Sequence, residues 1–405
     1  MDLVVRDTLT GTNRPVRHRP GRPVALYVCG PTVYDVAHVG HARTYLYFDV
    51  ARRFLEHEGV RVHHVVNVTD FEDKLDARAE QLGITWRALA RREERAFFRD
   101  LAALRILPPH DRPRASANVD RIIRVVEQLD ATGRVHREGN EWMYTPPPRP
   151  PGSNFATSRQ LASHAVLEPG HPFPERKEES GEFMVWRLQD PPRPSWPGPW
   201  GRGFPGWHLE CYAMAQHLLG LPVDLHGGGP DLIYPHHYAE NEVSLTLRGR
   251  PFSHIFLYPG FVLIGGAKMS KSVGRLIPLR EALRDVGASP LRWYLLSTSL
   301  AKPLKWDPRE LHAAAKEHEI LRRTIREWIG TGRGGRGRAA SATRLSEEVR
   351  RALAHGLATD RAFARLRAWA ATVRGRPELR LAPSERARAR RAFRAIEGRT
   401  GLSLL

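Results

Sequence analysis

The chain has 405 residues, enough for two or three domains, and 41% of them are hydrophobic and 26% charged, a composition typical of soluble globular proteins. No run approaches the roughly 18 apolar residues that a membrane span needs, and the N-terminal MDLVVRDTLTGTNRP lacks the basic, apolar and cleavage regions of a secretory signal. We therefore expect a cytoplasmic protein without a membrane partner.

The charge is strongly basic and unevenly distributed. Lys and Arg number 63 against 44 Asp and Glu, a net charge of +19. Residues 301–405 hold 25 Lys and Arg against 11 Asp and Glu, so this last quarter carries +14 of the excess. An arginine-rich genome accounts for single arginines, but segregation of the charge into one segment favours an acidic partner such as nucleic acid.

The predicted elements alternate at first between strands and helices. Residues 24–28 form an apolar run of strand length, followed by a loop and by an amphipathic stretch at 44–59. RVHHVVNVTD, at 61–70, repeats the strand pattern, and residues 74–107 have apolar residues at helical spacing. Such alternation predicts a parallel sheet with helices on its faces.

The pattern changes after residue 107. A helix at 118–129, a hairpin around 135–144 and the stretches TPPPRPPG and DPPRPSWPGPWGRGFPG indicate an insertion, after which strand patterns return in PVDLHGGGPDLIYP and HIFLYPGFVLIGG. From about Asp307 the chain becomes helical and arginine-rich, and its loop GTGRGGRGRAAS is expected to be flexible.

These patterns predict an α/β fold: a Rossmann-like parallel-sheet domain with an inserted connective subdomain, followed by an α-helical bundle. The predicted parts are the sheet domain at 1–107 and 205–265, the insertion at 108–204, a region at 266–306 with a loop that contains Lys268 and Lys271, and the basic helical bundle at 307–405. We call that loop the lysine loop.

The segment His38-Val39-Gly40-His41 lies where the first strand passes into a helix, the crevice in which open α/β sheets bind nucleotides. Two imidazoles one turn apart, with a glycine that lets the backbone approach closely, suit a phosphate chain near a helix N-terminus. Alone, this tetrapeptide is weak evidence for ATP binding.

A second segment, Lys268-Met269-Ser270-Lys271-Ser272, lies in a glycine-flanked loop after a strand. Two lysines there can reach a triphosphate and offset the negative charge that develops when a carboxylate attacks the α-phosphate. A solvated Lys/Ser loop is the simpler alternative. In this order and about 230 residues apart, the two segments resemble the HIGH and KMSKS signatures of class I aminoacyl-tRNA synthetases.

The two cysteines suit a metal or catalytic role better than a disulfide, because a cytosolic chain does not readily keep one. Cys29 closes the first strand, Cys211 lies in GWHLEC, and His236 and Glu240 stand four residues apart, on one face if that stretch is helical. Two thiolates, an imidazole and a carboxylate make a plausible zinc shell, although a lone Cys or His is more often buried structure.

Both cysteines fall in segments similar to cysteinyl-tRNA synthetase, YVCGPTVYD and GWHLECYAM, accompanied by DLHGGGPDLIYPHH. In that family the residues matching Cys29, Cys211, His236 and Glu240 bind one Zn²⁺, which binds the substrate thiol directly. A pocket that recognises a side chain by shape alone would favour cysteine over serine by only about 1 to 3 kcal/mol of binding free energy. Zinc discriminates by bonding instead, because it prefers a soft thiolate to a hydroxyl. We therefore expect no editing domain.

The resemblance implies further roles. The catalytic residues would be His38, His41, Lys268 and Lys271. The ATP-binding residues would be Gly40, His226, Gly227, Gly228, Asp231, Lys268, Met269, Ser270 and Lys271, and the amino-acid pocket would include Thr69, Asp70, Trp207 and His208. For each of these the alternative is a residue that merely packs. The implied partners are ATP with Mg²⁺, L-cysteine and tRNA(Cys), and we expect a monomer.

Three features depart from the family pattern. KMSKSVG continues with Arg275 where asparagine is usual, and the segment HHYAENE replaces HHENE, which keeps Glu240 as the ligand and leaves Glu242 as the fallback. The sequence stops at EGRTGLSLL, about where the family's bundle ends and a small anticodon-reading domain usually follows. Anticodon recognition is therefore an open question.

Three functions follow from these patterns. A cysteine–tRNA ligase is favoured by the basic last quarter, by CGPTVYD and GHAR, and by the basic loop at 333–338. The related mycothiol-pathway ligase, which joins cysteine to an amino sugar, has a similar short tail and resembles GITWRALARRE, LPPHD and PSWPGPWGRG. An inactive paralogue that binds tRNA or a partner protein would need neither the zinc ligands nor the lysine loop.

Overall fold

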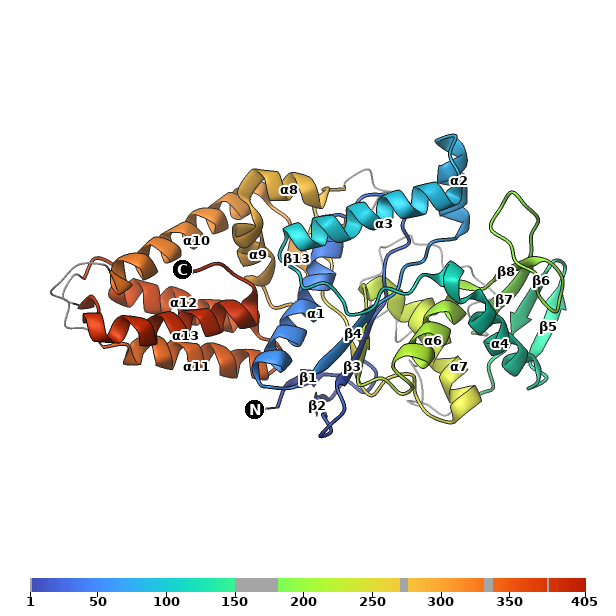
Figure 1. Cartoon of the computed structure of the whole chain (residues 1–405), viewed down its shortest axis with the longest axis horizontal. Helices are drawn as coiled ribbons and strands as arrows, with labels where there is room; N and C mark the ends of the chain where they lie inside the picture. The colour runs from blue at the N-terminus through green and yellow to red at the C-terminus, as the bar shows by residue number, and fades with distance from the viewer. Residues whose placement is uncertain (1, 150–180, 270–275, 331–337, 377–378) are drawn as a thin grey trace.

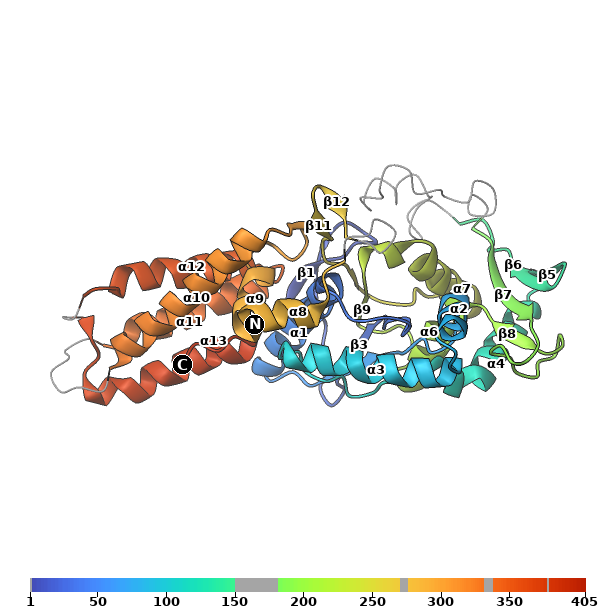
Figure 2. The same cartoon turned by 90° about the horizontal axis from the view of Figure 1, so that it is seen from above.

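The computed structural model of the chain describes residues 2–149, 181–269, 276–330, 338–376 and 379–405. The molecule is elongated, with a helical bundle at one end, an antiparallel sheet at the other and a parallel sheet between them (Figure 1). The view from above shows the same order along the long axis (Figure 2). Among the described residues, no helix is long and apolar enough to cross a lipid bilayer.

A four-stranded parallel sheet forms the centre, in the order β10-β9-β3-β4. Its strands are β3 (Val24–Val28), β4 (Val62–Val66), β9 (Leu225–Gly227) and β10 (Phe256–Leu257). All five residues of β3 are buried, because helices cover both faces of the sheet. The predicted α/β class and both predicted strands in the first part of the chain are confirmed.

Residues 111–114 run beside β4 through two parallel bridges, Val65 to Asp111 and Val68 to Arg114. The chain therefore still belongs to the edge of this sheet after residue 107. A short hairpin of β1 (Val4–Arg6) and β2 (Asn13–Pro15) precedes the sheet.

The side chains of β3 alternate between two cores, as the pleat of a strand requires. Leu26 and Val28 pack with α1 (Val39–His57) and α3 (Trp86–Ala103), whereas Ala25 and Tyr27 pack with α6 (Trp207–Leu218) and α7 (Tyr238–Arg248). Helix α2 (Asp73–Gln81) precedes α3. Thr85 caps α3 by accepting a hydrogen bond from the Ala88 amide.

The insertion carries the predicted helix and hairpin. Helix α4 (Val119–Asp130) follows η1 (Ala115–Asn118) and packs against α6 and α7. An antiparallel sheet contains β5 (Val135–Glu138), β6 (Glu141–Tyr144), β7 (Phe183–Leu188) and β8 (Gly203–Pro205). Both predictions are confirmed to within one residue at each end, because hairpin and helix patterns are local.

A small three-stranded sheet follows the central sheet in the chain. It consists of β11 (Val262–Ile264), β12 (Ala267–Lys268) and β13 (Leu304–Lys305), with α8 (Leu279–Val286) and α9 (Ala288–Leu296) between β12 and β13. The predicted flexible loop at 330–341 lies mostly at 331–337, outside the described residues, and its last two residues, Ala340 and Ser341, belong to α11 and not to a loop. Ser270, Lys271 and Ser272 of the lysine loop also lie outside the described residues, within 270–275.

The bundle consists of α10 (Pro308–Ile329), α11 (Ala340–Ala354), α12 (Thr359–Val373) and α13 (Arg386–Thr400), with η5 (Pro383–Glu385) before α13. Trp328, Trp369 and Phe393 pack edge to face at its centre, with ring centroids 5.1 to 6.4 Å apart. Helix α13 packs along α1, so the bundle and the central sheet share one continuous core.

Candidate active site and metal centre

Four buried side chains converge at the carboxyl end of β3. Cys29 directly follows β3, Cys211 lies in α6, and His236 and Glu240 lie on either side of the junction between η3 (Ile233–His237) and α7. One donor atom from each lies within 4.8 Å of the others. The two Sγ atoms are 3.6 Å apart, close to the roughly 3.8 Å edge of a tetrahedron with zinc–sulfur bonds of about 2.3 Å.

His236 and Glu240 form an ion pair across one helical turn, with Nε2 and Oε1 3.0 Å apart. The spacing of four residues therefore places both side chains together, as the sequence predicts. The fallback residue Glu242 lies outside the cluster, because its carboxylate pairs with Arg149 at 3.0 Å.

The cluster is electrostatically suited to a cation. Burial raises the pKa of the Glu240 carboxyl, but the histidines around it, His236 first, lower that pKa well below the usual value. Burial lowers the pKa of His236, yet Glu240 and Cys211 raise it to about 10. Burial likewise raises the pKa of Cys211, but its hydrogen bond with Cys29 and the nearby His236 bring it to about 7. A bound dication would take the place of the protons that now balance this charge.

Two of the predicted pocket residues, Trp207 and His208, contact His236, and a third, Thr69, contacts Glu210. The Trp207 ring stacks on the His236 ring, with centroids 4.2 Å apart. His208 Nδ1 lies 3.1 Å from His236 Nδ1, so the Nε2 edge of His236 turns toward Glu240. Thr69 donates to the buried carboxylate of Glu210 over 3.1 Å. The contacts of Trp207 and His208 fix the orientation of the His236 imidazole.

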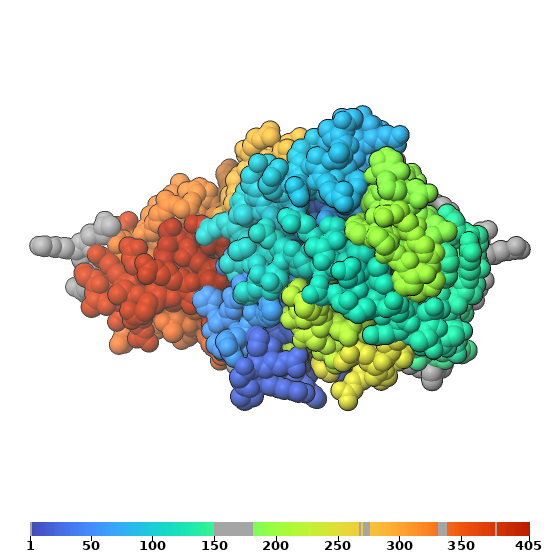
Figure 3. Space-filling view, turned by 45° about the vertical axis from the view of Figure 1, so that its right-hand side comes forward, coloured from blue at the N-terminus to red at the C-terminus, as the bar shows by residue number. Residues whose placement is uncertain are grey.

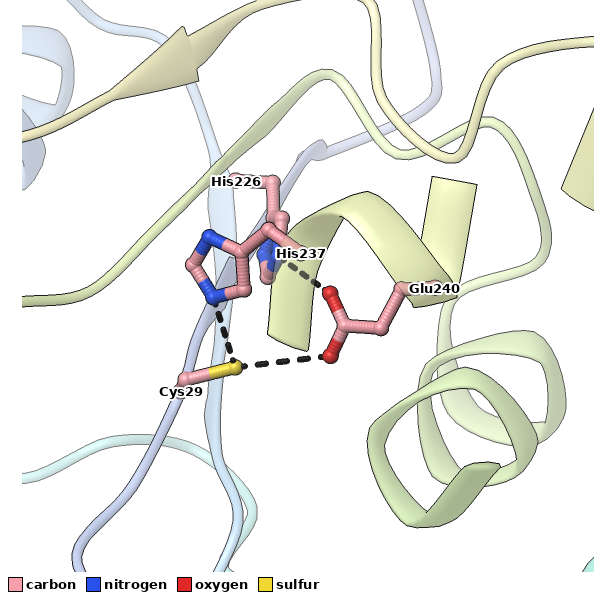
Figure 4. A group of neighbouring side chains, drawn as sticks. All are labelled: Cys29, His226, His237 and Glu240. Carbon is pink, nitrogen blue, oxygen red and sulfur yellow. Dashed lines mark hydrogen bonds and ion pairs between the residues drawn. The ribbon is translucent and has the colours of Figure 1, made fainter. Parts of the chain in front are cut away.

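A second group of possible ligands shares Cys29 and Glu240 with the first and adds His226 and His237 (Figure 4). His237 Nε2 lies 3.2 Å from Cys29 Sγ, and its Nδ1 lies 2.5 Å from the hydroxyl of Tyr258. His237 is not among the ligands predicted from the sequence, although the two adjacent histidines in PHHYAE are a visible signal.

His226, expected among the ATP contacts, is fully buried below the metal donors. Its Nδ1 lies 3.0 Å from the carbonyl oxygen of Tyr27, and its Nε2 lies 2.8 Å from Glu240 Oε2. Because a carbonyl oxygen only accepts, Nδ1 carries a proton and donates it. Both ring nitrogens are thus engaged, and the histidine orients the Glu240 carboxylate.

The segment His38-Val39-Gly40-His41, called the HxGH segment below, forms the first turn of α1. His38 is the N-cap, and its Nδ1 accepts from the His41 amide at 3.3 Å while His41 Nδ1 accepts from the His38 amide at 3.4 Å. The two rings stack with centroids 3.6 Å apart. Because each Nδ1 accepts, Nε2–H is the donating edge of each ring. The first turn of α1 holds no acidic residue, so its positive dipole end favours an anion.

The second signature segment is held against the first. A Cβ atom on Gly40 would lie 3.1 Å from Met269 Cε and 3.0 Å from the His38 ring, so only glycine allows this approach without displacement. Beyond the lysine loop, the Leu279 amide donates to the Ala37 carbonyl at 2.8 Å. Lys268 ends β12.

The remaining predicted residues surround these groups. A Cβ on Gly227 would lie 2.0 Å from the Leu257 carbonyl oxygen, so packing requires glycine there. A Cβ on Gly228 would lie 2.7 Å from Leu232 Cδ1 and 3.3 Å from Cys29 Cβ, so a side chain there would displace these neighbours. Asp231 is exposed beside them. Asp70 accepts from the Ser116 amide and hydroxyl at 2.8 and 2.5 Å, which ties it to η1.

Comparison with known proteins agrees with this arrangement. The family described as "tRNA synthetases class I (C) catalytic domain" matches residues 16–316. The chain is 41% identical over 326 residues to the cysteine–tRNA ligase of Dehalococcoides mccartyi, covering 80% of this chain and 70% of that one. It is 38% identical over 335 residues to the enzyme of that name from Aeropyrum pernix, covering 81% and 70%.

Solved structures show the same fold at low sequence identity. Mycobacterium tuberculosis methionyl-tRNA synthetase in complex with methionyl-adenylate superposes with a TM-score of 0.63 at 19% identity, covering 94% of this chain and 88% of that one. Since the family match spans most of the chain and the relatives above align over most of their own length, the chain belongs to the class I aminoacyl-tRNA synthetases, within the family of the cysteine–tRNA ligases.

Proposed function

We propose that this chain is a cytoplasmic cysteine–tRNA ligase that converts L-cysteine and ATP into cysteinyl adenylate and transfers the cysteinyl group to tRNA(Cys). The observation that carries the proposal is the position of the donor cluster. Cys29 directly follows β3, the strand that leads into His38 and His41, so the proposed thiol ligand and the proposed nucleotide-binding turn lie at the same edge of the sheet.

Cys29, Cys211, His236 and Glu240 would hold one Zn²⁺, because their donor types and the Sγ–Sγ spacing of 3.6 Å suit a tetrahedral shell. Bound there, zinc supplies a Lewis acid that prefers the soft thiolate of cysteine to the hydroxyl of serine. His226 and His237 support this shell by contacting Glu240 and Cys29.

The other side chains have separate tasks. Trp207 packs on His236 and excludes water from one side of the amino-acid pocket, whose opposite wall we assign to Thr69 and Asp70. The Nε2–H edges of His38 and His41 would donate to ATP phosphate oxygens, with Gly227, Gly228 and Asp231 beside the nucleoside.

Lys268 and Lys271 would balance the charge on the phosphates together with the Mg²⁺ that accompanies ATP. The cysteine carboxylate then attacks the α-phosphorus in line, a carboxyl–phosphate bond forms, and pyrophosphate leaves. A ribose hydroxyl at the 3′ end of tRNA attacks the acyl carbon and releases AMP. Positioning and charge stabilisation supply most of the rate, because the protein forms no covalent bond.

The parts of the chain would divide this work. We assign activation to residues 1–107 and 205–265, with the connective insertion at 108–204 and the lysine-loop region at 266–306 closing the site. The helical bundle at 307–405 carries most of the net positive charge and would contact the tRNA backbone.

The test is acceptor transfer by zinc-loaded protein supplied with ATP and radiolabelled cysteine. One reaction contains total tRNA and another contains the amino-sugar acceptor of mycothiol-type ligases, and pyrophosphate exchange into ATP is measured in parallel. Label on tRNA, with exchange driven by cysteine and not by serine, is the expected result. Label on the amino sugar alone would assign the chain to the other ligases, and absence of exchange would indicate an inactive paralogue.

A further inference from the structure

A cavity of about 310 Å³ lies between α1, β4, α3 and residues 106–112, which is at the small end of the roughly 300–1,000 Å³ range of ligand pockets. Its wall is mainly apolar and includes Val66, Phe98, Leu101 and Ile106. None of its lining residues belongs to the metal cluster, the HxGH segment or the lysine loop. The cavity therefore has no role in the proposed reaction.

One polar side chain in the wall lacks a partner. His64 lies in the middle of β4 and is only 3% exposed, and neither of its ring nitrogens has a hydrogen-bond partner. Leaving a buried polar group unpaired is unfavourable, because it loses its hydrogen bonds to water and gains none. A neutral imidazole offers one donor and one acceptor, so a ligand with a polar atom in the cavity would satisfy it.

Three guanidinium groups line the same cavity. Arg95, Arg99 and Arg112 are exposed, and the Arg112 guanidinium lies over the Phe98 ring at 4.8 Å from its centroid. In the part of the chain that the structure describes, Arg99 approaches only Asp100, at 3.9 Å, and no carboxylate pairs with Arg95 or Arg112. Their combined charge favours an anion.

The helix that carries Arg95 and Arg99 is accessible to solvent. In Figure 3, the cyan surface of α3 and the residues that follow it occupies the centre of the molecule, between the red and orange bundle and the green segment before α6. A small molecule can therefore approach the arginines without displacing an element of the fold.

We propose that this cavity binds a small amphipathic anion, a molecule with an aromatic or aliphatic body and a single carboxylate. The apolar body packs on Phe98 and Leu101, the carboxylate pairs with the arginines, and one oxygen of the same carboxylate accepts the hydrogen bond that His64 offers. The site is independent of the ATP, cysteine and tRNA sites.

The cavity is nevertheless one side chain away from the active site. Tyr45 lines it and donates to the Cys29 carbonyl oxygen at 3.0 Å, and the Phe97 ring contacts the rings of both Tyr45 and His41 at 5.5 Å. Binding is therefore measured on zinc-loaded protein, because Tyr45 contacts Cys29, one of the proposed zinc ligands.

The probe is 4-phenylbutyrate, compared by calorimetric titration with its neutral amide and with 4-phenylbutylamine. The carboxylate is expected to bind saturably, the amide at least fivefold more weakly, and the amine not at all. Equal affinity for the three compounds, or no saturable binding of 4-phenylbutyrate, would overturn the proposal.

Matched substitutions locate the site. Ala102 and Ala103 are neighbouring exposed residues at the end of α3, and only Ala102 lines the cavity. Ala102→Trp should fill the cavity and weaken 4-phenylbutyrate at least tenfold, whereas Ala103→Trp should change affinity less than twofold. Arg112→Gln should remove most of the preference for the carboxylate over the amide. Unchanged affinity in Ala102→Trp would mean that the probe binds elsewhere and would refute the assignment.

Discussion

The guanidinium of Arg292 in α9 lies 2.6 Å from the carboxylate of Asp49 in α1, and both side chains are fully buried. Arg292 also donates to the carbonyl oxygens of Leu104 at 3.1 Å and Thr400 at 2.6 Å. Burial raises the pKa of Asp49, but Arg292 and Arg53 lower it below its usual value. The ion pair therefore joins α1 to α9, and the same guanidinium holds the last residue of α13 in the bundle.

Removing one partner of this pair should be costly. Asp49→Ala leaves the Arg292 guanidinium buried without a counter-charge, and we expect the free energy of unfolding to fall by about 3–5 kcal/mol, measured by urea denaturation. The control is Glu348→Ala, whose partner Arg365 is 4.0 Å away and 64% exposed, and which should cost less than about 1 kcal/mol. Similar losses in the two variants would show that the buried pair contributes no more to the free energy of unfolding than an exposed pair.

The proposed role of Glu240 as the fourth zinc ligand can be tested by comparing it with the neighbouring Glu242. Glu240 and Glu242 are both buried in α7, but only Glu240 lies in the donor cluster, while Glu242 pairs with Arg149. Glu240→Gln should weaken zinc binding by more than the roughly 10–100-fold typical of supporting residues. Glu242→Gln should retain one zinc per chain after dialysis against a chelator, as counted by mass spectrometry. Full occupancy in Glu240→Gln would remove Glu240 from the shell.

Gly40 should matter for catalysis more than for stability. Alanine is favoured over glycine in a helix by about 1 kcal/mol, so Gly40→Ala should not lower the melting temperature. Its methyl group would meet the His38 ring at 3.0 Å and Met269 at 3.1 Å. The Met269 side chain can yield, but His38 is held by its capping hydrogen bonds.

Cysteine-dependent pyrophosphate exchange should therefore fall at least tenfold in Gly40→Ala, about 1.4 kcal/mol of transition-state stabilisation. Zinc content and the circular dichroism spectrum serve as controls and should match those of the wild type. Exchange within twofold of the wild-type rate would show that the HxGH turn tolerates the displacement.

His318 should make the bundle sensitive to acid. It is 1% exposed, its Nε2 lies 3.0 Å from the Ser289 hydroxyl, and burial, assisted by Arg322, lowers its pKa to about 4. Below about pH 6.5 the unfolded chain binds a proton that the folded chain does not. The stability that neutral His318 provides is thus complete above pH 6.5 and is lost as pH falls toward 4.

The comparison variant is His318→Gln, which keeps a nitrogen for Ser289 and does not titrate. Between pH 7 and pH 5 the wild type should lose about 2 kcal/mol more than this variant. His312 gives the opposite sign, because its bonds to the Pro308 carbonyl and to Asp285 raise its pKa. Its stabilisation is present at low pH and lost on raising the pH. A difference between wild type and His318→Gln that does not depend on pH would contradict the assignment.

Local sequence patterns were sufficient for several elements and for selecting four residues whose side chains the structure brings together. Strand β3 was predicted with its observed bounds, and the hairpin at 135–144 and helix α4 were predicted to within one residue. Their patterns repeat over two to four residues and depend little on distant contacts. Cys29, Cys211, His236 and Glu240 were selected because each lies in a recognisable segment.

Only the tertiary structure decided how these segments meet. Asp49 and Arg292 are 243 residues apart in sequence, and neither position differs in sequence from an ordinary charged residue of an amphipathic helix. His226 and His237 contact Glu240 and Cys29 because β9 pairs with β3 and the backbone departs from helical geometry at Tyr234. The cavity beside His64 likewise exists only where three elements pack. Periodicity reports which face of an element is buried, whereas the partners of that face depend on how the whole chain packs.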